Sequence, residues 1–186
     1  MAVLLVFPGI SVKQQPEVKE DVNGKWSIIT EKSRFEFKIQ AMHLFSVKGN
    51  FTGVTGSIEI KQNFYGIKVD LTVDPSTIDT GNDKRDDHLK HEDFFNVELY
   101  PNITFTAEKI TSQAGDQKYM VEGQLTIKDI SQTIKVPITF EGMNEDGHIV
   151  FSGSKNINRR EYNINYSGKG VGDVAELDFI IVASRD

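Results

Sequence analysis

The feature that most constrains this 186-residue chain is an alternation of apolar and polar residues with a period of two. In one such run, Phe35, Phe37 and Ile39 alternate with charged and polar residues. Because successive side chains of a β-strand point to opposite faces, this period predicts strands with one buried face and one wet face. The predicted strands are Trp26–Phe37, Lys48–Ile60, Ile67–Val73, Asn102–Ile110, Tyr119–Ile127, Thr133–Phe140, His148–Ile157 and Glu176–Ala183.

Turn-forming residues separate these runs and indicate how the strands connect. Gly115-Asp116 and Glu145-Asp146-Gly147 are typical of tight turns between antiparallel strands. About eight antiparallel strands with a single wet face must close into a barrel or stack as two sheets. Short successive connections favour an all-β, eight-stranded antiparallel barrel, which also removes exposed strand edges, and a two-sheet sandwich is the alternative. The polar stretch Asn156–Gly172 is expected to be a long loop or an irregular strand.

One interval, Thr77–Tyr100, breaks the strand pattern and predicts a short helical insertion. Asn82 or Asp83 can cap the N-terminus of a helix, and the acidic residues that follow suit the positive end of its dipole. We therefore expect two or three helical turns over about Lys84–Phe94, inserted between two strands.

Composition excludes several classes of function. The 21 basic and 27 acidic residues give a net charge of −6, whereas non-specific nucleic-acid binding needs clustered Lys and Arg. The chain has no cysteine, which excludes disulfides, zinc–thiolate sites, iron–sulfur clusters and cysteine nucleophiles. No apolar run approaches the roughly 20 residues that span a bilayer. We expect neither a nucleic-acid partner nor stable insertion into a membrane.

The first residues differ in character from the rest of the chain. The apolar stretch Ala2–Phe7 lacks an early Lys or Arg, and Pro8-Gly9 interrupts it. It fits either the remainder of an export signal or a terminal strand, and we favour the strand. We assign residues 1–24 to an N-terminal extension and residues 25–186 to one β-barrel domain.

Five blocks of sequence, in order, resemble the YceI-like family of lipid-binding proteins, whose fold is a lipocalin-like β-barrel. The blocks are SRFEFKI (Ser33–Ile39), VKGNFTGVTGSIEI (Val47–Ile60), STIDTGNDKRDDHLKHEDFFNVELYPNITF (Ser76–Phe105), VEGQLTIKDISQTIKVPITF (Val121–Phe140) and INRREYNINY (Ile157–Tyr166). The resemblance runs from about Trp26 to Ala183. Three stretches depart from the family pattern, all near predicted strand ends: Ile29, Lys32-Ser33 and Glu161-Tyr162-Asn163.

The resemblance implies a long apolar cavity that holds a polyisoprenoid chain, such as a quinone tail or a polyprenyl phosphate. It also suggests a homodimer, and it implies no cofactor other than bound isoprenoid lipid. For the compartment it implies the periplasm or secretion, whereas the chain as written, without a convincing export signal, fits the cytoplasm. We leave the compartment open and expect a lipid-binding protein that transports or stores its ligand.

The cavity that the resemblance implies assigns ligand contacts to the apolar strand faces. The candidate interior consists of Phe35, Phe37, Val69, Leu71, Ile103, Phe105, Leu125, Ile138 and Phe179. The helical insertion adds His88 and Leu89, with Phe94 and Phe95 as a lid over one end. Arg159 is a candidate counter-charge for a pyrophosphate at the barrel mouth, and pairing of the Arg159-Arg160 dipeptide with Glu161 or Asp173 is the alternative. An eight-stranded barrel is wide enough either to hold a ligand or to be filled by these side chains as an ordinary core.

Two other classes of function compete with lipid binding. An enzyme acting on a lipid or quinone would use His88 with Asp86 or Asp87, but acids at the start of a helix are more often caps, and no GxSxG elbow is present. We therefore predict that the protein is not an enzyme. His88 and His91 with Glu92 lack the HExxH spacing and a third ligand, so we predict no metal site. A solidly packed, stress-related structural module is the remaining alternative.

Overall fold

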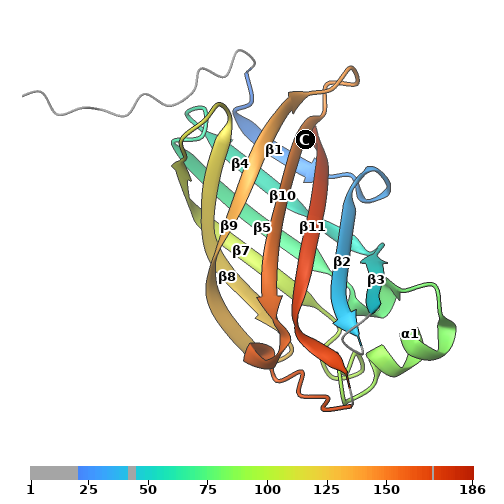
Figure 1. Ribbon diagram of the computed structural model, residues 1–186. Coiled ribbons are helices and arrows are strands. Elements are labelled where there is room, and N and C mark those ends of the chain that lie inside the picture. The colour runs from blue at the N-terminus through green and yellow to red at the C-terminus, as the bar shows by residue number, and fades with distance from the viewer. Residues whose placement is uncertain (1–20, 42–44, 169) are drawn as a thin grey trace, which may run out of the picture.

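The computed structural model describes residues 21–41, 45–168 and 170–186, which form strands around one short α-helix (Figure 1). The strands are β1 (Gly24–Ile28), β2 (Arg34–Ala41), β3 (Phe45–Phe51), β4 (Val54–Lys61), β5 (Gly66–Val73), β6 (Ile78–Asp79), β7 (Ile103–Ser112), β8 (Lys118–Ile127), β9 (Ile130–Met143), β10 (Ile149–Asn158) and β11 (Val171–Arg185). The helix is α1 (Asp83–Lys90), and the 3-10 turns are η1 (Thr30–Lys32), η2 (Pro75–Thr77) and η3 (Arg159–Tyr162). The predicted terminal strand Ala2–Phe7 lies outside the described residues.

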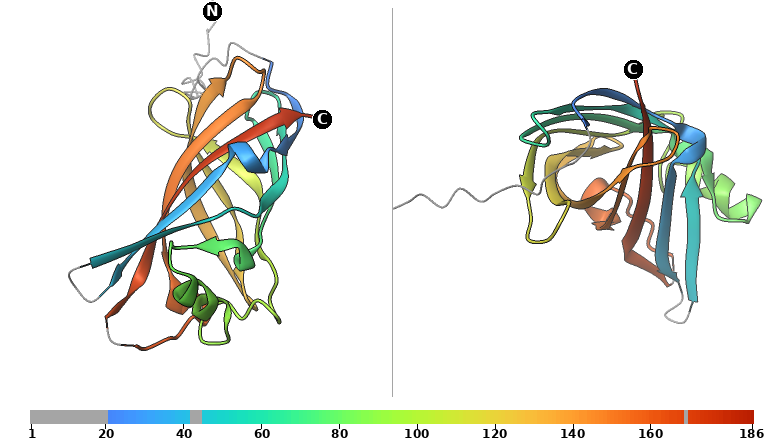
Figure 2. Two further views of the ribbon diagram at one scale, coloured as in Figure 1. Left: turned by 90° about the vertical axis from the view of Figure 1, so that its right-hand side faces the viewer. Right: turned by 90° about the horizontal axis from the view of Figure 1, so that it is seen from above.

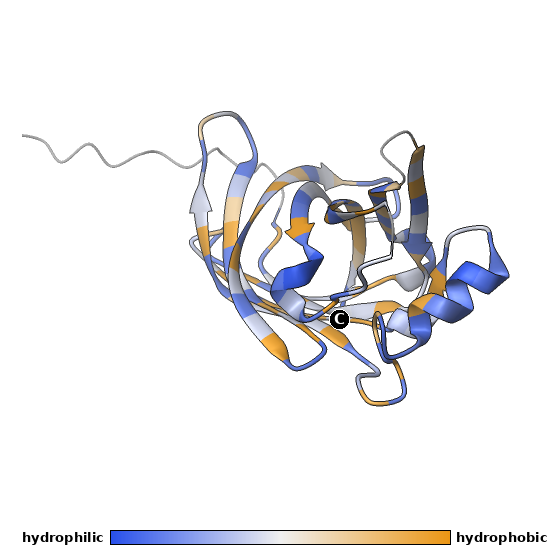
Figure 3. Ribbon diagram, turned by 60° about the horizontal axis from the view of Figure 1, so that its bottom comes forward, coloured by the Kyte–Doolittle hydropathy of each residue, from blue (hydrophilic) through white to orange (hydrophobic). Residues whose placement is uncertain are grey.

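Eight of these strands close into an antiparallel barrel. Their order is β1-β4-β5-β7-β8-β9-β10-β11, and β11 pairs back onto β1. The alternation of apolar and polar residues puts one face of each strand inside this ring, as the bands of hydropathy along the strands illustrate (Figure 3). The structure confirms the predicted eight-stranded barrel with a helical insertion, and the sandwich alternative is wrong.

The barrel wall branches at β11. The C-terminal end of β11 pairs with β1, with Ala183 opposite Ile28, whereas its N-terminal part pairs with β2, with Phe179 opposite Phe35. Beyond β2 come β3 and then the two-residue strand β6. Figure 2 shows β2 and β3 extending from the rest of the barrel as a tilted ribbon.

The predicted strand Trp26–Phe37 is broken into β1 and β2 by the turn η1. The Ser33 hydroxyl donates to the Ile29 carbonyl at 2.8 Å, and the Ser33 amide donates to the same carbonyl at 3.0 Å. These two bonds close a turn that the period-two pattern does not encode. The turn offsets β2 from β1, so that both can pair with successive parts of β11.

The predicted strand Lys48–Ile60 is likewise two strands, β3 and β4, which separate at Thr52 and Gly53. The Gly53 amide donates to Thr77 Oγ1 at 2.9 Å, and the Gly53 carbonyl accepts from the Asp74 amide at 2.8 Å. The backbone leaves the β-ladder at Gly53 because Asp74 and Thr77, which follow β5, bind the carbonyl and the amide of Gly53.

Aromatic side chains fill the end of the barrel opposite α1. Phe64, from the turn between β4 and β5, has its ring centroid 4.7 Å from Tyr119, 5.2 Å from Phe140 and 6.0 Å from Phe151. Each of these four residues is at most 2% exposed. We call Phe64, Tyr119, Phe140 and Phe151 the aromatic plug. Trp26 adds to the same core, and its indole donates to the Val22 carbonyl at 2.9 Å.

The predicted helix is present but ends earlier than expected, at Lys90 instead of Phe94. Asn82 is its N-cap and accepts from the Arg85 amide at 3.1 Å. After Lys90 the chain turns back, and the Phe95 amide donates to the Leu89 carbonyl at 3.1 Å. This turn carries Phe94 into the interior, where it is 8% exposed. Burial of Phe94 therefore outweighs continuation of the helix.

The stretch predicted as a polar loop or irregular strand, Asn156–Gly172, is more ordered than expected. β10 continues into it as far as Asn158, and η3 follows directly. Arg159, Tyr162 and Ile164 within this stretch are buried. The loop is therefore part of the core at the α1 end of the barrel.

Candidate ligand-binding cavity

A cavity of about 400 Å³ occupies the barrel interior between the aromatic plug and the end where α1 lies. This volume is within the range of about 300–1,000 Å³ that small-molecule sites occupy. The inward-facing residues of the strands provide most of the lining, including Ile58, Val121 and Phe151 near the plug. Side chains therefore do not fill the lumen, and the cavity contradicts the alternative of a solidly packed module.

All fourteen residues predicted to contact a ligand line this cavity. The strands supply Phe35, Phe37, Val69, Leu71, Ile103, Phe105, Leu125, Ile138 and Phe179, and the segments at the α1 end supply His88, Leu89, Phe94, Phe95 and Arg159. Their contact with a bound ligand stays a prediction. The strand residues come together because the period-two pattern alone decides which side of the wall each residue faces.

Glycines of the sheet let phenylalanine rings lie along the wall of the cavity. Phe37 is paired with Gly49 across β2 and β3, and a Cβ atom on that glycine would lie 2.6 Å from Phe37 Cζ. Phe179 is paired in the same way with Gly153 on β10, where a Cβ atom would overlap its ring. Each ring occupies the place of the missing side chain, so that the centre of the barrel stays open.

The rim of the cavity next to α1 is aromatic. The His88 ring meets the rings of Phe94 and Tyr166 edge-on, with centroids 5.2 Å and 5.3 Å away. The Phe94 and Tyr166 rings are 4.8 Å apart. Phe95 packs edge-on against Phe51 of β3 at 5.9 Å. Phe94 and Phe95 thus lie at the end of the cavity, in the position predicted for a lid.

The carboxylate beside His88 is Asp93, and the predicted pairing with Asp86 or Asp87 does not form. His88 Nε2 lies 3.4 Å from Asp93 Oδ2. The buried Asp86 carboxylate accepts from the amide of Thr80 at 3.0 Å and from its hydroxyl. Asp87 is exposed, 4.0 Å from the Lys90 ammonium. The pairing of His88 with Asp86 or Asp87, on which the enzymatic alternative depended, is therefore not formed, because Asp86 binds Thr80 and Asp87 lies near Lys90.

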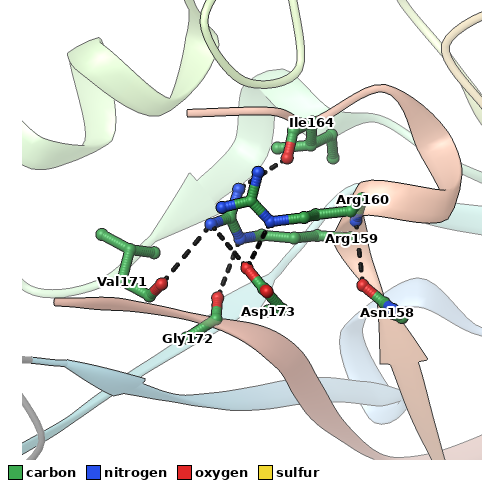
Figure 4. A network of polar contacts seen from close by, with 7 residues as sticks. All are labelled: Asn158, Arg159, Arg160, Ile164, Val171, Gly172 and Asp173. Carbon is green, nitrogen blue, oxygen red and sulfur yellow. Dashed lines mark hydrogen bonds and ion pairs between the residues drawn. The ribbon is translucent and has the colours of Figure 1, made fainter. Parts of the chain in front are cut away.

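Arg159 is buried, with 6% of its surface exposed, and its guanidinium binds main-chain carbonyls (Figure 4). Nε donates to the Gly172 carbonyl at 2.8 Å, and Nη1 donates to the Ile164 carbonyl at 2.5 Å. Nη2 donates to the Val171 carbonyl at 3.4 Å. These bonds tie the loop after η3 to the start of β11.

Asp173 supplies the counter-charge for both arginines of the Arg159-Arg160 pair. Its Oδ1 accepts from Arg159 Nη2 at 3.1 Å and from Arg160 Nε at 2.6 Å (Figure 4). Burial lowers the pKa of Arg159 below its ordinary value, the nearby Arg160 lowers it further, and Asp173 opposes the shift. Of the pairings predicted for Arg159 and Arg160, the ion pair with Asp173 is present. Arg159 forms its ion pair although its side chain is buried.

Four polar residues that the sequence analysis did not single out also line the cavity: Gln40, Arg85, Lys155 and Tyr166. The alternation along β10 could have predicted one of them, because Lys155 lies on the same inward face of the strand as Phe151 and Ile157. Arg85 and Tyr166 lie outside the barrel strands. Only the tertiary fold brings them to the cavity, and no local pattern predicts it.

Among residues 21–41, 45–168 and 170–186, no three histidine, aspartate or glutamate side chains are grouped as a metal site would need. Over the same residues, no helix has the length and apolar character needed to cross a membrane.

Comparison with known proteins agrees with this architecture. BcnA of Burkholderia cenocepacia superposes with a TM-score of 0.76 at 25% identity, covering 84% of this chain and 99% of BcnA. A polyisoprenoid binding domain from Saccharophagus degradans, implicated in plant cell wall breakdown, shares the fold with a TM-score of 0.73 at 14% identity, covering 87% of this chain and 98% of that domain. A UPF0312 protein of Staphylococcus aureus is 35% identical over 143 residues, 73% of this chain and 79% of the relative. The YceI-like domain matches residues 26–183, nearly the whole described barrel, and this chain belongs to the YceI-like family.

Proposed function

We propose that this protein binds an isoprenoid lipid, with the tail inside the barrel and the head group at the end next to α1. The observation that carries the proposal is the cavity, which is lined mostly by apolar side chains and is bounded by the aromatic plug at its inner end. The fold shared with a polyisoprenoid binding domain of Saccharophagus degradans supports it. A quinone or a polyprenyl phosphate has the required shape, and transport or storage would both use such a site.

The dimensions of the lining suit a linear chain. On β11 the inward residues run from Ala175 to Ile181, which is about 20 Å of strand. A branched, flexible tail can follow this length between the phenylalanine rings. A bulky, rigid ligand would need those rings to move.

Burial of methylene groups would supply most of the affinity. Each buried methylene contributes about 0.8 kcal/mol, so one five-carbon isoprene unit contributes about 4 kcal/mol. Eight units would then total about 30 kcal/mol, beyond the ceiling of roughly 18–21 kcal/mol for real complexes. The cost of ordering a flexible chain must offset much of the gain. Affinity should therefore rise with tail length until the cavity is full.

The test is a series of prenyl alcohols of increasing length, from geraniol to geranylgeraniol and longer, added to delipidated protein. Native mass spectrometry and titration calorimetry should show affinity that rises with each added unit and then levels off. Equal affinity for short and long tails would overturn the proposal.

A pair of variants locates the binding in the barrel. Val69→Trp places a large side chain in the lumen, whereas Lys68→Trp places it on the outer face of the same strand. We expect Val69→Trp to shorten the longest tail that binds and Lys68→Trp to leave the series unchanged. The reverse pattern would place the ligand outside the barrel.

A further inference from the structure

The turn between β4 and β5 has a backbone conformation that its residues do not favour. Gln62, Asn63 and Phe64 have φ angles of 50°, 50° and 69°. The Tyr65 amide donates to the Gln62 carbonyl at 3.2 Å, which makes the two residues between them the centre of a tight turn. Hairpin turns with positive φ at both central residues favour Asn at the first and Gly at the second. Asn63 fits this preference, whereas the bulky Phe64 takes the place of the glycine at a steric cost.

One side chain joins this strained turn to the core of the barrel. Gln62, Asn63 and Tyr65 are exposed, whereas Phe64 is fully buried in the aromatic plug. The Phe64 ring meets the Phe151 ring edge-on at 6.0 Å, and Phe151 also lines the cavity. Phe64 therefore lies directly behind the inner end of the cavity, and its ring is the part of the turn that closes this end.

A reciprocal pair of hydrogen bonds, which we call the latch, holds the turn from outside. The Asn63 amide donates to Asn23 Oδ1, and Asn23 Nδ2 donates to Asn63 Oδ1, both at 2.9 Å. Arg185 holds the segment of Asn23 in place, because its Nη1 donates to the Asn23 carbonyl at 2.7 Å and its guanidinium lies 4.5 Å from the centre of the Trp26 ring. The latch is on the surface, where hydrogen bonds compete with water and contribute only modestly to stability.

The closed plug also leaves a polar group without a partner. Tyr119 Oη is buried, and it forms no hydrogen bond with any residue of 21–41, 45–168 and 170–186. A buried polar group of this kind is costly. The Tyr119 ring packs against Phe64, with the centroids 4.7 Å apart. Displacement of Phe64 would expose this ring to water, where its hydroxyl can form hydrogen bonds.

We propose that residues 62–65 form a gate at the plug end of the barrel, which opens when Phe64 leaves the plug and lets a tail longer than the cavity extend through this end. The inference rests on the proposed lipid-binding function and adds a second opening to it. The aromatic contacts of Phe64 and the latch favour the closed form, whereas the positive φ angles and the Tyr119 hydroxyl favour the open form. A long tail shifts the balance, because only the open form has room for it.

Hydrogen exchange in the native sequence provides the first test, with two prenyl alcohols as probes. Geraniol is short enough for the closed cavity, whereas the extended tail of solanesol is longer than the roughly 20 Å of the lumen. Saturating solanesol should speed exchange of the Asn63 and Tyr65 amides at least about ten-fold, because opening breaks their hydrogen bonds, and geraniol should not. Unchanged or slower exchange with solanesol would overturn the inference.

A covalent lock provides the second test. The chain has no cysteine, so the double variant Asn23→Cys, Asn63→Cys carries its only two thiols. A short thiol-specific cross-linker then fixes the turn to the segment before β1. We expect cross-linking to weaken solanesol binding at least about ten-fold and to leave geraniol binding unchanged. Equal solanesol affinity before and after cross-linking would overturn the inference.

The matched control for the lock is the double variant Glu122→Cys, Lys135→Cys. These residues are register partners on β8 and β9, and their side chains form an ion pair outside the cavity lining. Cross-linking them should change the affinity for neither alcohol. If the control loses solanesol binding to the same extent, the effect belongs to the linker and the gate is refuted.

Gln62→Gly tests the contribution of the strained backbone. Glycine adopts positive φ without the steric cost, so the closed turn should become more stable, and exchange of the Tyr65 amide without ligand should slow by about three-fold or more. Gln117→Gly makes the same change at a φ of 58°, in the turn between β7 and β8, and should leave the Tyr65 amide unaffected. An unchanged rate in Gln62→Gly would overturn the role of strain on which the gate depends.

The outcomes separate the gate from the proposed function. If both alcohols bind but neither exchange nor the lock detects opening, the gate is refuted, while the dependence of affinity on tail length still stands. If no prenyl alcohol binds, both proposals fail.

Discussion

Glycines of the sheet determine where the phenylalanine rings that line the cavity can lie. Besides Gly49 and Gly153, which face Phe37 and Phe179 directly, Gly123 on β8 lies diagonally from Phe105. A Cβ atom there would lie 2.8 Å from Phe105 Cζ and 2.7 Å from the Cβ of its register partner Ala107. An aromatic ring over a glycine on the neighbouring strand is an established way of stabilising that glycine within a sheet. In this protein the same device also keeps the rings against the wall, and so it keeps the cavity open.

Substitution of Gly153 tests this role. In Gly153→Ala the new methyl group would overlap the Phe179 ring and would lie 2.7 Å from the Pro137 carbonyl oxygen. We expect the ring to move into the lumen, prenyl alcohols to bind at least about ten-fold more weakly, and unfolding free energy to fall by about 1–3 kcal/mol.

The matched control for that experiment is Gly66→Ala. A Cβ atom there would only be in ordinary contact with Lys61, at 3.5 Å. Its effect on stability should stay within about 0.5 kcal/mol, and ligand affinity should not change. Urea unfolding and calorimetry measure both quantities, and unchanged binding in Gly153→Ala would contradict the role of the glycine.

A second residue-scale prediction concerns pH and the buried Tyr162. Burial, with a smaller contribution from the charge of Glu161, raises the pKa of this phenol from 10.0 to about 12. The folded protein therefore holds this proton more tightly than the unfolded chain. Its contribution to stability is complete below pH 10 and is lost as the pH rises toward about 12.

Unfolding free energies measured across this alkaline window should fall with pH more steeply for the native sequence than for Tyr162→Phe. Tyr65→Phe is the control, because Tyr65 is 64% exposed and its removal should leave the slope unchanged. Identical slopes for the native sequence and Tyr162→Phe would contradict this assignment.

At the scale of elements, the connection between β10 and β11 depends on one side chain. Arg159 binds carbonyls of Ile164, Val171 and Gly172, which belong to the loop after η3 and to the start of β11. Without its guanidinium these carbonyls would lose their partner. The order of the loop at the α1 end of the barrel therefore follows from Arg159 more than from the loop's own sequence.

Arg159→Met should lower the free energy of unfolding by about 2–4 kcal/mol, because buried hydrogen-bonding groups lose their partner. Amide hydrogen exchange should become faster in the loop around Ile164 and at the start of β11. Arg160→Met removes a solvent-exposed ion pair to the same Asp173 and should cost less than about 1 kcal/mol. Equal costs for the two variants would show that the buried network does not hold the loop.

The period-two pattern predicted the strands well but could not predict where they break. The turn between β1 and β2 depends on the Ser33 hydroxyl, and the separation of β3 from β4 depends on Thr77, which is distant in the chain. The helix ended early because Phe94 is buried against the rest of the protein. The last two differences come from tertiary contacts, which a local pattern does not contain, whereas the bond from Ser33 to Ile29 is local but leaves no trace in a period of two.

At the scale of the whole molecule, the local pattern could predict only part of the cavity. Strand residues such as Leu71 and Phe105 could be predicted to face inward, because a strand has only two faces. That the lumen stays hollow depends on how the rings of Phe37 and Phe179 lie over glycines of neighbouring strands. The resemblance to a family implied a cavity, while periodicity alone favoured a filled core.

The branched wall also explains why the molecule has two unlike ends. Where β4 pairs with both β1 and β5, the ring is closed, and the aromatic plug fills it. At the other end β3 pairs with β2 and β6 instead of β5, and the segment with α1 lies there (Figure 1). A lipid held tail-first would enter from this second end.

The most direct test is a crystal structure of the delipidated protein reloaded with a prenyl phosphate that carries bromine at the end of its tail. Anomalous scattering then locates the tail end without reference to the rest of the ligand. We predict one bromine peak at the inner end of the lumen, beside Ile58, Val121 and Phe151, with the phosphate toward α1. A bromine peak on the outer face of the barrel, or an occupied lumen with the bromine next to α1, would contradict the account.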